Sequence, residues 1–264
     1  YEKTVSYGKG TAKGPEAILN ASYEIEDFDE ELSMPVGIRA QTLPALNLKN
    51  MDQKKAFSLI ENKSGEVYRQ SRCLLALGGE HSVTVPLVSA ARKAFGNFTV
   101  LHFDAHLDIR DTFRGSRYSH ACPMRRIREM NLPTVHVGIR SSCVEEYEYT
   151  KKNRIPVFWA QDIVNSQTDS WIKKVVSKLS KRVYISFDID ALDLSIAPGT
   201  GTPEPGGLGW YQTLALLREV FRRREVVAAD IVEVAPVKGS NITEFTAARL
   251  GLKMLVYHRY SSKV

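Results

Sequence analysis

Short apolar runs recur along the chain, and segments of helix length separate them. Several runs, such as Val183–Phe187, are apolar at nearly every position. Both faces of such strands must be covered, as they are in a parallel sheet between two layers of helices. The pattern predicts strands over Val36–Ala40, Cys73–Leu77, Thr99–Phe103, Thr134–Val137, Val157–Trp159, Val183–Phe187 and Val226–Val232.

The segments between these runs have the apolar spacing of amphipathic helices. Alternation of strands and helices predicts an α/β fold, a parallel sheet with a layer of helices on each face. Without an internal repeat, linker or low-complexity tract, residues 1–264 are predicted to form one domain. Helices are predicted near Gln53–Arg69, Val85–Phe95, Met124–Met130, Trp171–Leu179, Trp210–Arg223 and Thr246–His258.

Composition narrows the class of protein. Of 264 residues, 43% are hydrophobic and 25% charged, which argues against a disordered, collagen-like or coiled-coil chain. No run reaches the ~18 apolar residues of a membrane span, so we expect no membrane partner. Three cysteines are too few for a disulfide framework, and a reducing cytoplasm is expected. The net charge of +6 is a weak indication of nucleic acid, and no binding motif supports it.

Aspartate and histidine residues follow the ends of three predicted strands. Asp104, His106 and Asp108 follow one strand at every second position, and alternate side chains of an extended chain share a face. Asp188 and Asp190 repeat this spacing after another strand, and His81 follows a third after two glycines. Any one of these Asp residues alone reads best as a helix N-cap. Together, four Asp and two His predict a metal site.

The kinds of donor atom indicate which metal ion the site prefers. It contains oxygen and nitrogen but no thiolate, which favours a harder ion such as Mn²⁺ over structural zinc. Six ligands, four of them carboxylates, suit two ions that share carboxylates.

Three blocks then resemble the signatures of the ureohydrolase family, which contains arginases and agmatinases. The resemblance continues beyond them and covers nearly the whole chain. The matching segments are Gly78–His81, Phe103–Asp108, Ser186–Asp193, Ala197–Gly207, Ser6–Ala17 and Asp230–Pro236. The resemblance implies a three-layer α/β/α fold with a central parallel sheet of about eight strands. It also implies two Mn²⁺ ions per chain and a homo-oligomer, a hexamer or trimer.

Carried over position by position, the resemblance implies two ligand sets. One ion would be held by His81, Asp104, Asp108 and Asp188, and the other by Asp104, His106, Asp188 and Asp190. A hydroxide between the ions would attack the guanidinium carbon and release urea and an amine. His120 would protonate the leaving amine, and Glu233 would hold the guanidinium group. Plainer interpretations are a surface histidine for His120 and a strand-end cap for Glu233. His102, His136 and His258 are interpreted as structural.

Two positions bear on the substrate. Arginases carry Asn where this chain has Arg110, and an Asp-Val-Asp triplet where it has Ser141–Cys143. Both features that read the α-amino and α-carboxylate groups of arginine are missing, so agmatine is the expected small-molecule guanidino substrate and putrescine the product. Guanidinobutyrate, arginine and formiminoglutamate stay open, the first because Arg110 could bind its acid.

Other classes of function also remain open. An inactive metal-binding homologue would serve a structural or regulatory role, but all eight expected residues are present. A two-metal phosphoesterase would need a phosphate clamp, which the six Arg residues between positions 110 and 128 could supply.

Overall fold

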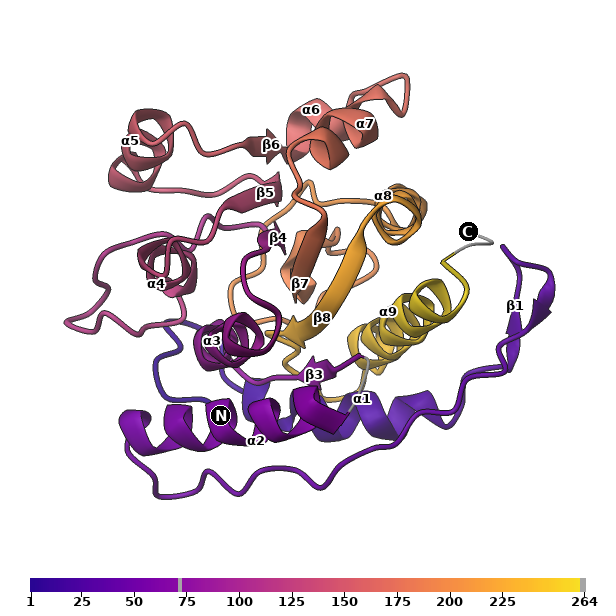
Figure 1. Cartoon of the computed structure of the whole chain (residues 1–264), viewed down its shortest axis with the longest axis horizontal. Helices are drawn as coiled ribbons and strands as arrows, with labels where there is room; N and C mark the ends of the chain where they lie inside the picture. The colour runs from indigo at the N-terminus through magenta and orange to yellow at the C-terminus, as the bar shows by residue number, and fades with distance from the viewer. Residues whose placement is uncertain (71–72, 262–264) are drawn as a thin grey trace.

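A six-stranded sheet, parallel throughout, forms the centre of the molecule in the computed structural model (Figure 1). The structure describes residues 1–70 and 73–261. From one edge to the other, the strands are β3 (Leu75–Leu77), β8 (Glu225–Val232), β7 (Arg182–Asp188), β4 (Thr99–Phe103), β5 (Thr134–Ile139) and β6 (Val157–Trp159). The predicted parallel α/β fold is confirmed.

Six predicted strands are confirmed within two residues at each end, and the seventh is wrong. Val36–Ala40 has no strand structure; it follows a small antiparallel hairpin of β1 (Phe28–Asp29) and β2 (Met34–Pro35). Gly37 has φ 54°, which interrupts an extended chain, and only Val36 of this segment is buried. The central sheet of the described residues has six strands, one fewer than the apolar pattern predicted and fewer than the about eight that the family resemblance implied.

All six predicted helices are present, with small shifts at their ends. Helices α1, α5 and α6 were not predicted. Gly14 and Pro15 obscure the start of α1, and α5 buries only Glu146 and Thr150, so it has no apolar stripe. The helices are α1 (Gly14–Ser22), α2 (Gln53–Gln70), α3 (Thr84–Phe95), α4 (Pro123–Glu129), α5 (Val144–Lys152), α6 (Ala160–Val164), α7 (Ser170–Ser177), α8 (Trp210–Arg223) and α9 (Ile242–Arg259).

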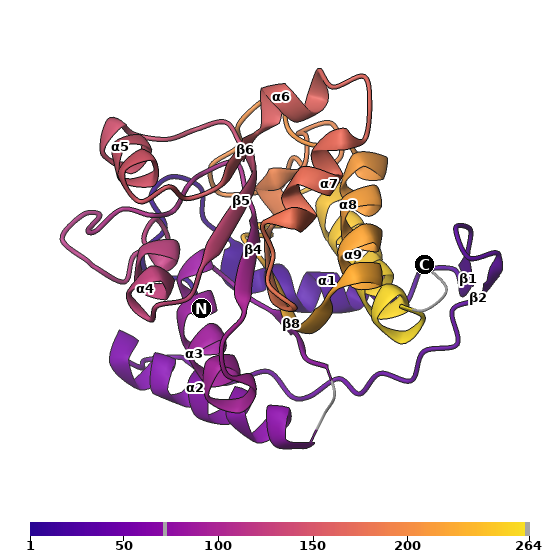
Figure 2. The same ribbon diagram turned by 45° about the horizontal axis from the view of Figure 1, so that its top comes forward.

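Helices cover both faces of the sheet, as Figure 2 shows. On one face α2, α3 and α4 pack on the strands, and on the other α7, α8 and α9 do. Alternation along β7 divides its side chains between the two cores: Val183, Ile185 and Phe187 join one, and Tyr184 joins the other. Two buried faces explain why this strand is apolar at successive positions.

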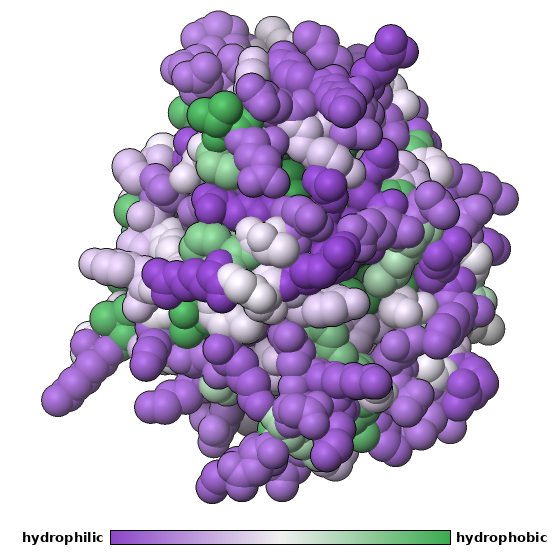
Figure 3. All heavy atoms as spheres, turned by 90° about the vertical axis from the view of Figure 1, so that its left-hand side faces the viewer, coloured by the Kyte–Doolittle hydropathy of each residue, from purple (hydrophilic) through white to green (hydrophobic). Residues whose placement is uncertain are grey.

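The surface on the α4 and α5 side is mostly hydrophilic, with small separated apolar groups (Figure 3). Among the described residues, no helix combines the length and the apolar character that crossing a bilayer needs. In a parallel sheet all strands end at the same edge. The side chains predicted to bind metal and to act in catalysis follow those ends.

Candidate active site

The six predicted metal ligands come together beyond the carboxyl ends of β3, β4 and β7. His81 opens a short 3₁₀ turn after β3, and Asp104, His106 and Asp108 follow β4. Asp188 is the last residue of β7, and Asp190 lies in the next 3₁₀ turn, Ile189–Ala191. Five of the six are buried, and the His106 side chain is 24% exposed.

Two groups of donor atoms share one carboxylate. The His81 Nδ1 atom lies 3.2 Å from Asp104 Oδ2, 3.1 Å from Asp108 Oδ2 and 3.2 Å from Asp188 Oδ2. The His106 Nδ1 atom lies 3.4 Å from Asp104 Oδ1 and 3.1 Å from Asp190 Oδ2. The two oxygens of Asp104 thus face different groups, which is the geometry of a bridging carboxylate.

The hydrogen bonds around His81 leave its Nδ1 atom as a ligand. Ser186 Oγ donates to Asp230 Oδ1 at 2.9 Å, so it accepts from His81 Nε2 at 3.0 Å. A neutral His81 then directs the Nδ1 lone pair at three carboxylate oxygens, and this atom has no hydrogen-bond partner among the described residues. Four electron-rich atoms around one point require a cation. The donor set therefore fits a divalent metal ion.

Without a cation, protons supply the counter-charge. Burial, together with neighbouring carboxylates, raises the pKa of Asp188 well above its usual range and that of Asp108 to about 7. Burial opposes protonation of His81, but the carboxylates of Asp104, Asp108 and Asp188 beside its Nδ1 atom outweigh burial and raise its pKa well above the usual value. Metal binding would displace these protons.

Strand alternation predicted the convergence but not its local geometry. β4 ends at Phe103, so Asp104–Asp108 lies beyond the strand, and Asp108 has φ 49°. Asp190 reaches the cluster from a 3₁₀ turn in which its N–H donates to Asp188 Oδ1 at 2.9 Å. Left-handed backbone in a non-glycine residue is uncommon and tends to occur at functional sites.

A cavity of about 280 Å³ opens on this cluster. Its wall contains the predicted catalytic pair, several predicted ligands and all the positions that the sequence connected with substrate choice. They are His106, Asp108, Asp188, His120, Glu233, Arg110, Ser141, Ser142 and Cys143. The chemistry and the specificity positions thus share one pocket.

Glu233 follows β8 directly and is held in an unusual conformation. Its φ is 62°, its N–H donates to Gly79 O at 2.9 Å, and its Oε1 atom accepts the His81 N–H at 2.6 Å. Gly79 is required in this contact region, since a Cβ there would lie 1.8 Å from Tyr1 O. Burial raises the pKa of Glu233 to about 8. The Oε2 atom is the acceptor that remains for a ligand.

The backbone of His120 is tied to the start of the chain, which sequence reasoning did not anticipate. Its N–H donates to Thr4 Oγ1 at 2.9 Å, and Thr4 Oγ1 donates to Glu80 Oε1 at 2.7 Å. Glu80 is fully buried and also accepts the Thr4 N–H at 2.6 Å. Desolvation lowers the pKa of His120. The half-buried ring contacts Phe113 edge-on, with centroids 5.8 Å apart.

A charge pair, Arg110 and Glu146, also lines the cavity. Arg110 Nε lies 3.5 Å from Glu146 Oε2, and its guanidinium group stacks 4.7 Å from the Phe113 centroid. Glu146 is buried; it accepts the Ile109 N–H at 3.1 Å and the Cys143 N–H at 3.0 Å. Sequence reasoning missed Glu146, whose only local signal is its place in the first turn of α5.

His102 was interpreted as a structural residue, and the structure adds a contact with the cluster. Its Nε2 atom lies 2.8 Å from Asp104 Oδ2. The signal was available, because His102 precedes Asp104 by two residues and so shares its side of the chain. His136, on the neighbouring strand β5, contacts His102, whereas His258 lies near the end of α9.

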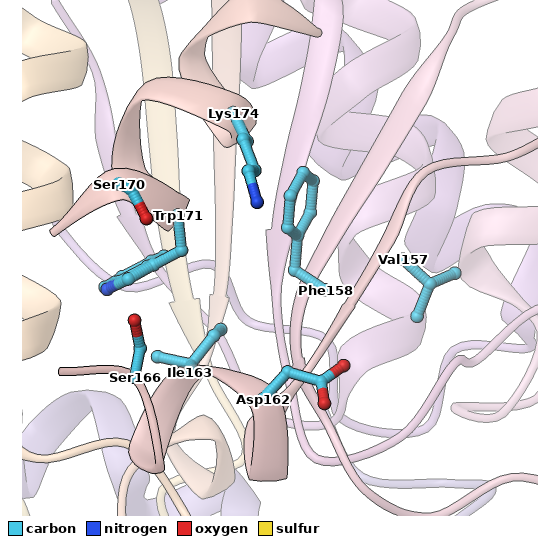
Figure 4. Close-up of a pocket in the computed structure, with 8 residues that line it drawn as sticks. All are labelled: Val157, Phe158, Asp162, Ile163, Ser166, Ser170, Trp171 and Lys174. Carbon is cyan, nitrogen blue, oxygen red and sulfur yellow. The ribbon is translucent and has the colours of Figure 1, made fainter. Parts of the chain in front are cut away.

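A second hollow, of about 300 Å³, lies between β6, α6 and α7 (Figure 4). Trp171 and Phe158 line it together with Asp162 and Lys174. None of the predicted ligands or catalytic residues belongs to its wall.

The sheet carries a buried carboxylate–imidazole cluster at its carboxyl edge, where the active sites of α/β proteins lie. This arrangement is typical of α/β enzymes with a metal-binding site. The arginase family model matches residues 1–256. The chain is 38% identical to the N(1)-aminopropylagmatine ureohydrolase of Synechocystis sp. over 265 residues, covering 97% of this chain and 86% of the relative. It is 34% identical to the agmatinase of Pyrococcus horikoshii over 256 residues, with 95% and 86% covered.

The likeness extends to solved structures. Proclavaminate amidino hydrolase from Streptomyces clavuligerus superposes with a TM-score of 0.89 at 30% identity, covering 97% of this chain and 88% of that chain. The chain belongs to the arginase family, and it is an enzyme of the ureohydrolase class, which hydrolyses amidine C–N bonds. The family resemblance seen in the sequence is confirmed.

Proposed function

We propose that this ureohydrolase cleaves the guanidinium group of agmatine, giving urea and putrescine, with two Mn²⁺ ions as cofactor. The observation that carries the proposal is the shared cavity. Its lining contains three residues of the carboxylate–imidazole cluster, Glu233 and His120, together with Arg110 and positions 141–143.

The six ligands would hold the ions as two overlapping sets. His81, Asp104, Asp108 and Asp188 would hold one, and Asp104, His106, Asp188 and Asp190 the other. The split orientation of the two Asp104 oxygens supports a shared ligand. When bound, a pair of divalent cations lowers the pKa of water and so supplies a nucleophile at neutral pH.

Glu233 would orient the guanidinium group. Because its Oε1 atom accepts the His81 N–H, the Oε2 atom is directed to a second donor. A charge-assisted hydrogen bond from a guanidinium N–H to Oε2 would place the carbon beside the cluster. The hydrogen bond from the Glu233 N–H to Gly79 O holds the left-handed backbone, which directs the carboxylate into this position.

His120 would handle the proton that the leaving amine needs. Desolvation lowers its pKa, which favours the neutral ring in the free protein, and an imidazole that takes up a proton could pass it to the leaving amine. Its backbone bond to Thr4 and the edge contact with Phe113 restrict where the ring can lie.

The part of the cavity lined by Arg110, Glu146 and positions 141–143 favours an amine over the two charged groups of arginine. Positions 141–143 supply two hydroxyls and a thiol but no carboxylate for an α-amino group. Glu146 is the carboxylate that remains there, and Arg110 balances it in the free protein. The terminal ammonium of the substrate would replace Arg110 as the partner of Glu146.

A second candidate substrate is N(1)-aminopropylagmatine, because the relative from Synechocystis carries that name at 38% identity. This compound adds an aminopropyl arm to the distal amine of agmatine. Guanidinobutyrate is the candidate if Arg110 binds a carboxylate, and formiminoglutamate and arginine complete the set.

The test measures the release of urea from each of these guanidino compounds and the consumption of formiminoglutamate. Each assay is run with and without added Mn²⁺. Agmatine turnover that depends on Mn²⁺ is the expected result. No turnover of any compound in Mn²⁺-loaded protein would instead indicate a catalytically inactive homologue.

We also propose that the enzyme is a cytoplasmic homo-oligomer, a trimer or hexamer, without a nucleic-acid partner. Light scattering on the purified protein gives the number of copies directly.

A further inference from the structure

A line of buried hydrogen bonds crosses from β5 to β4 and ends on the metal cluster. Thr134 Oγ1 lies 2.9 Å from His136 Nε2, and His136 Nδ1 lies 2.9 Å from His102 Nδ1. His102 Nε2 in turn lies 2.8 Å from Asp104 Oδ2. All four residues are at most 1% exposed. The two imidazoles are direct partners in the pairing of β4 with β5.

The partners decide the direction of each bond. An ionised Asp104 only accepts, so His102 Nε2–H donates to it. A neutral imidazole has one donor and one acceptor, so His102 Nδ1 accepts from His136 Nδ1–H. The remaining His136 Nε2 atom then accepts from the Thr134 hydroxyl. Every nitrogen of the two rings therefore has a hydrogen-bond partner, and each donor, from Thr134 onward, points along the line toward Asp104.

The sequence neighbours of the two imidazoles are apolar. Leu101, Phe103, Val135 and Val137 alternate with them on the two strands and join the core on the opposite face of the sheet, whereas Val100, two residues before His102, joins the core on the face of the imidazoles. Burying two polar rings in this interior is costly unless each polar atom has a partner. An apolar pair would fill the same space but would leave Asp104 Oδ2 without this donor.

Asp104 has its two oxygens committed in different directions. Oδ1 accepts the His106 N–H at 2.6 Å. Oδ2 accepts the His102 Nε2–H and lies 3.2 Å from His81 Nδ1. We propose that His102 and His136 are positioning residues, which hold the Asp104 carboxylate so that each oxygen faces one half of the cluster. The proposal rests on the proposed two-metal function.

Two amide variants of His102 separate positioning from packing. The amide nitrogen of Gln occupies roughly the place of Nε2, and the amide oxygen of Asn can occupy that of Nδ1, where it accepts from His136. His102→Gln therefore keeps a donor for Asp104, whereas His102→Asn keeps only the link toward His136. Both bury an amide in the same space, so each serves as the matched control for the other.

Mn²⁺ affinity is the readout, measured on metal-stripped protein by the electron paramagnetic resonance of free Mn²⁺. We expect His102→Asn to weaken Mn²⁺ binding by about 10–100-fold, the usual effect of losing a hydrogen-bond partner of a ligand. His102→Gln should stay within a few-fold of the wild type. The thermal unfolding midpoints of the two metal-free variants should be similar. Wild-type affinity in His102→Asn, or equal losses in both variants, would overturn the proposal.

His136 provides the second comparison, which decides the matter if the His102 variants do not fold. His136→Asn keeps a donor for His102 Nδ1, and His136→Leu removes it. The proposal expects weaker Mn²⁺ binding in His136→Leu than in His136→Asn, and equal affinities would contradict it. If the wild type itself neither binds Mn²⁺ nor releases urea, the proposed function fails. If it does both and the variants match it, only the positioning role fails.

Discussion

The backbone N–H of His120 donates to the hydroxyl of Thr4 at 2.9 Å, across 116 residues of sequence. Thr4 is held in turn by the buried carboxylate of Glu80, the residue directly before His81. The proposed proton donor and the proposed metal cluster are therefore held by the same N-terminal segment.

Replacement of His120 should impair catalysis without loss of metal. For His120→Ala we expect Mn²⁺ content to stay at the wild-type level and kcat to fall about 10²–10⁴-fold, as when a general acid–base group is lost. Free imidazole should restore part of the rate. Metal analysis beside steady-state kinetics checks this, and loss of Mn²⁺ in the variant would make His120 a ligand instead.

Asp188→Asn should disable the cluster as a whole. The substitution removes a negative charge that both ions are proposed to share, so both should bind more weakly, and activity should fall by several orders of magnitude. Circular dichroism should show the fold retained, since the amide is the same size. Turnover close to the wild-type value would rule out the two-metal mechanism.

Arginine should be a far poorer substrate than agmatine. Each missing charge-assisted contact removes about 1.5–3 kcal/mol, or roughly 10–150-fold. We therefore expect kcat/KM for agmatine at least ~100-fold above that for arginine. Side-by-side kinetics on one preparation of enzyme decide this, and equal values for the two substrates would refute the agmatinase assignment.

Arg110→Gln tests whether the Arg110–Glu146 pair determines which substrate binds. Removal of the cation that competes for Glu146 should lower KM for agmatine by about 1.5–5-fold, the range of a partly exposed ion pair. Arg114→Gln is the control, because Arg114 also stacks on Phe113, at 5.5 Å, but does not line the cavity. If guanidinobutyrate is the better substrate and only Arg110→Gln loses it, Arg110 binds a carboxylate.

The metal-free protein should become less stable as pH rises from about 7 to 8. The unfolded chain titrates its carboxyls near pH 4, whereas burial raises the pKa of Asp108 to about 7 and that of Glu233 to about 8. Burial lowers the pKa of His102 and His136, but histidines of the unfolded chain have largely lost their protons by about pH 7 and so add little opposing effect in this window. The folded state thus binds more protons between about pH 7 and 8, and the free energy of unfolding falls with increasing pH. Thermal unfolding with a chelator, compared with excess Mn²⁺, should show the larger stabilisation by metal at pH 8. A midpoint that rises with pH in the chelated sample contradicts this.

The sequence predicted the sheet and the convergence of the carboxylates and imidazoles well because both depend on local patterns. Apolar strands such as Val183–Phe187 are continuous in the chain, and the ligands follow directly from strand ends. What it missed depends on contacts between distant segments. Glu146 reaches the cavity from a helix with no apolar stripe, and Thr4 reaches His120 from the start of the chain. No spacing rule within one segment reveals either contact.

The number of strands was overestimated for a related reason. Val36–Ala40 has apolar residues at alternate positions, but Gly37 adopts a left-handed conformation and the segment pairs with no strand of the sheet. Asp108 shows the same limit on a smaller scale. Its spacing placed it correctly in the cluster, although a turned backbone rather than an extended one brings it there.

The strand order has a consequence for the time course of folding. β8, the last strand in the chain, lies between β3 and β7, so His81 and Asp188 approach each other only after that strand is inserted. A cation bound by both residues can therefore stabilise the completed sheet but cannot nucleate it. Of the two proposed ions, the one held by His81 should slow unfolding and leave the refolding rate nearly unchanged, because interactions formed after the transition state act on the unfolding rate.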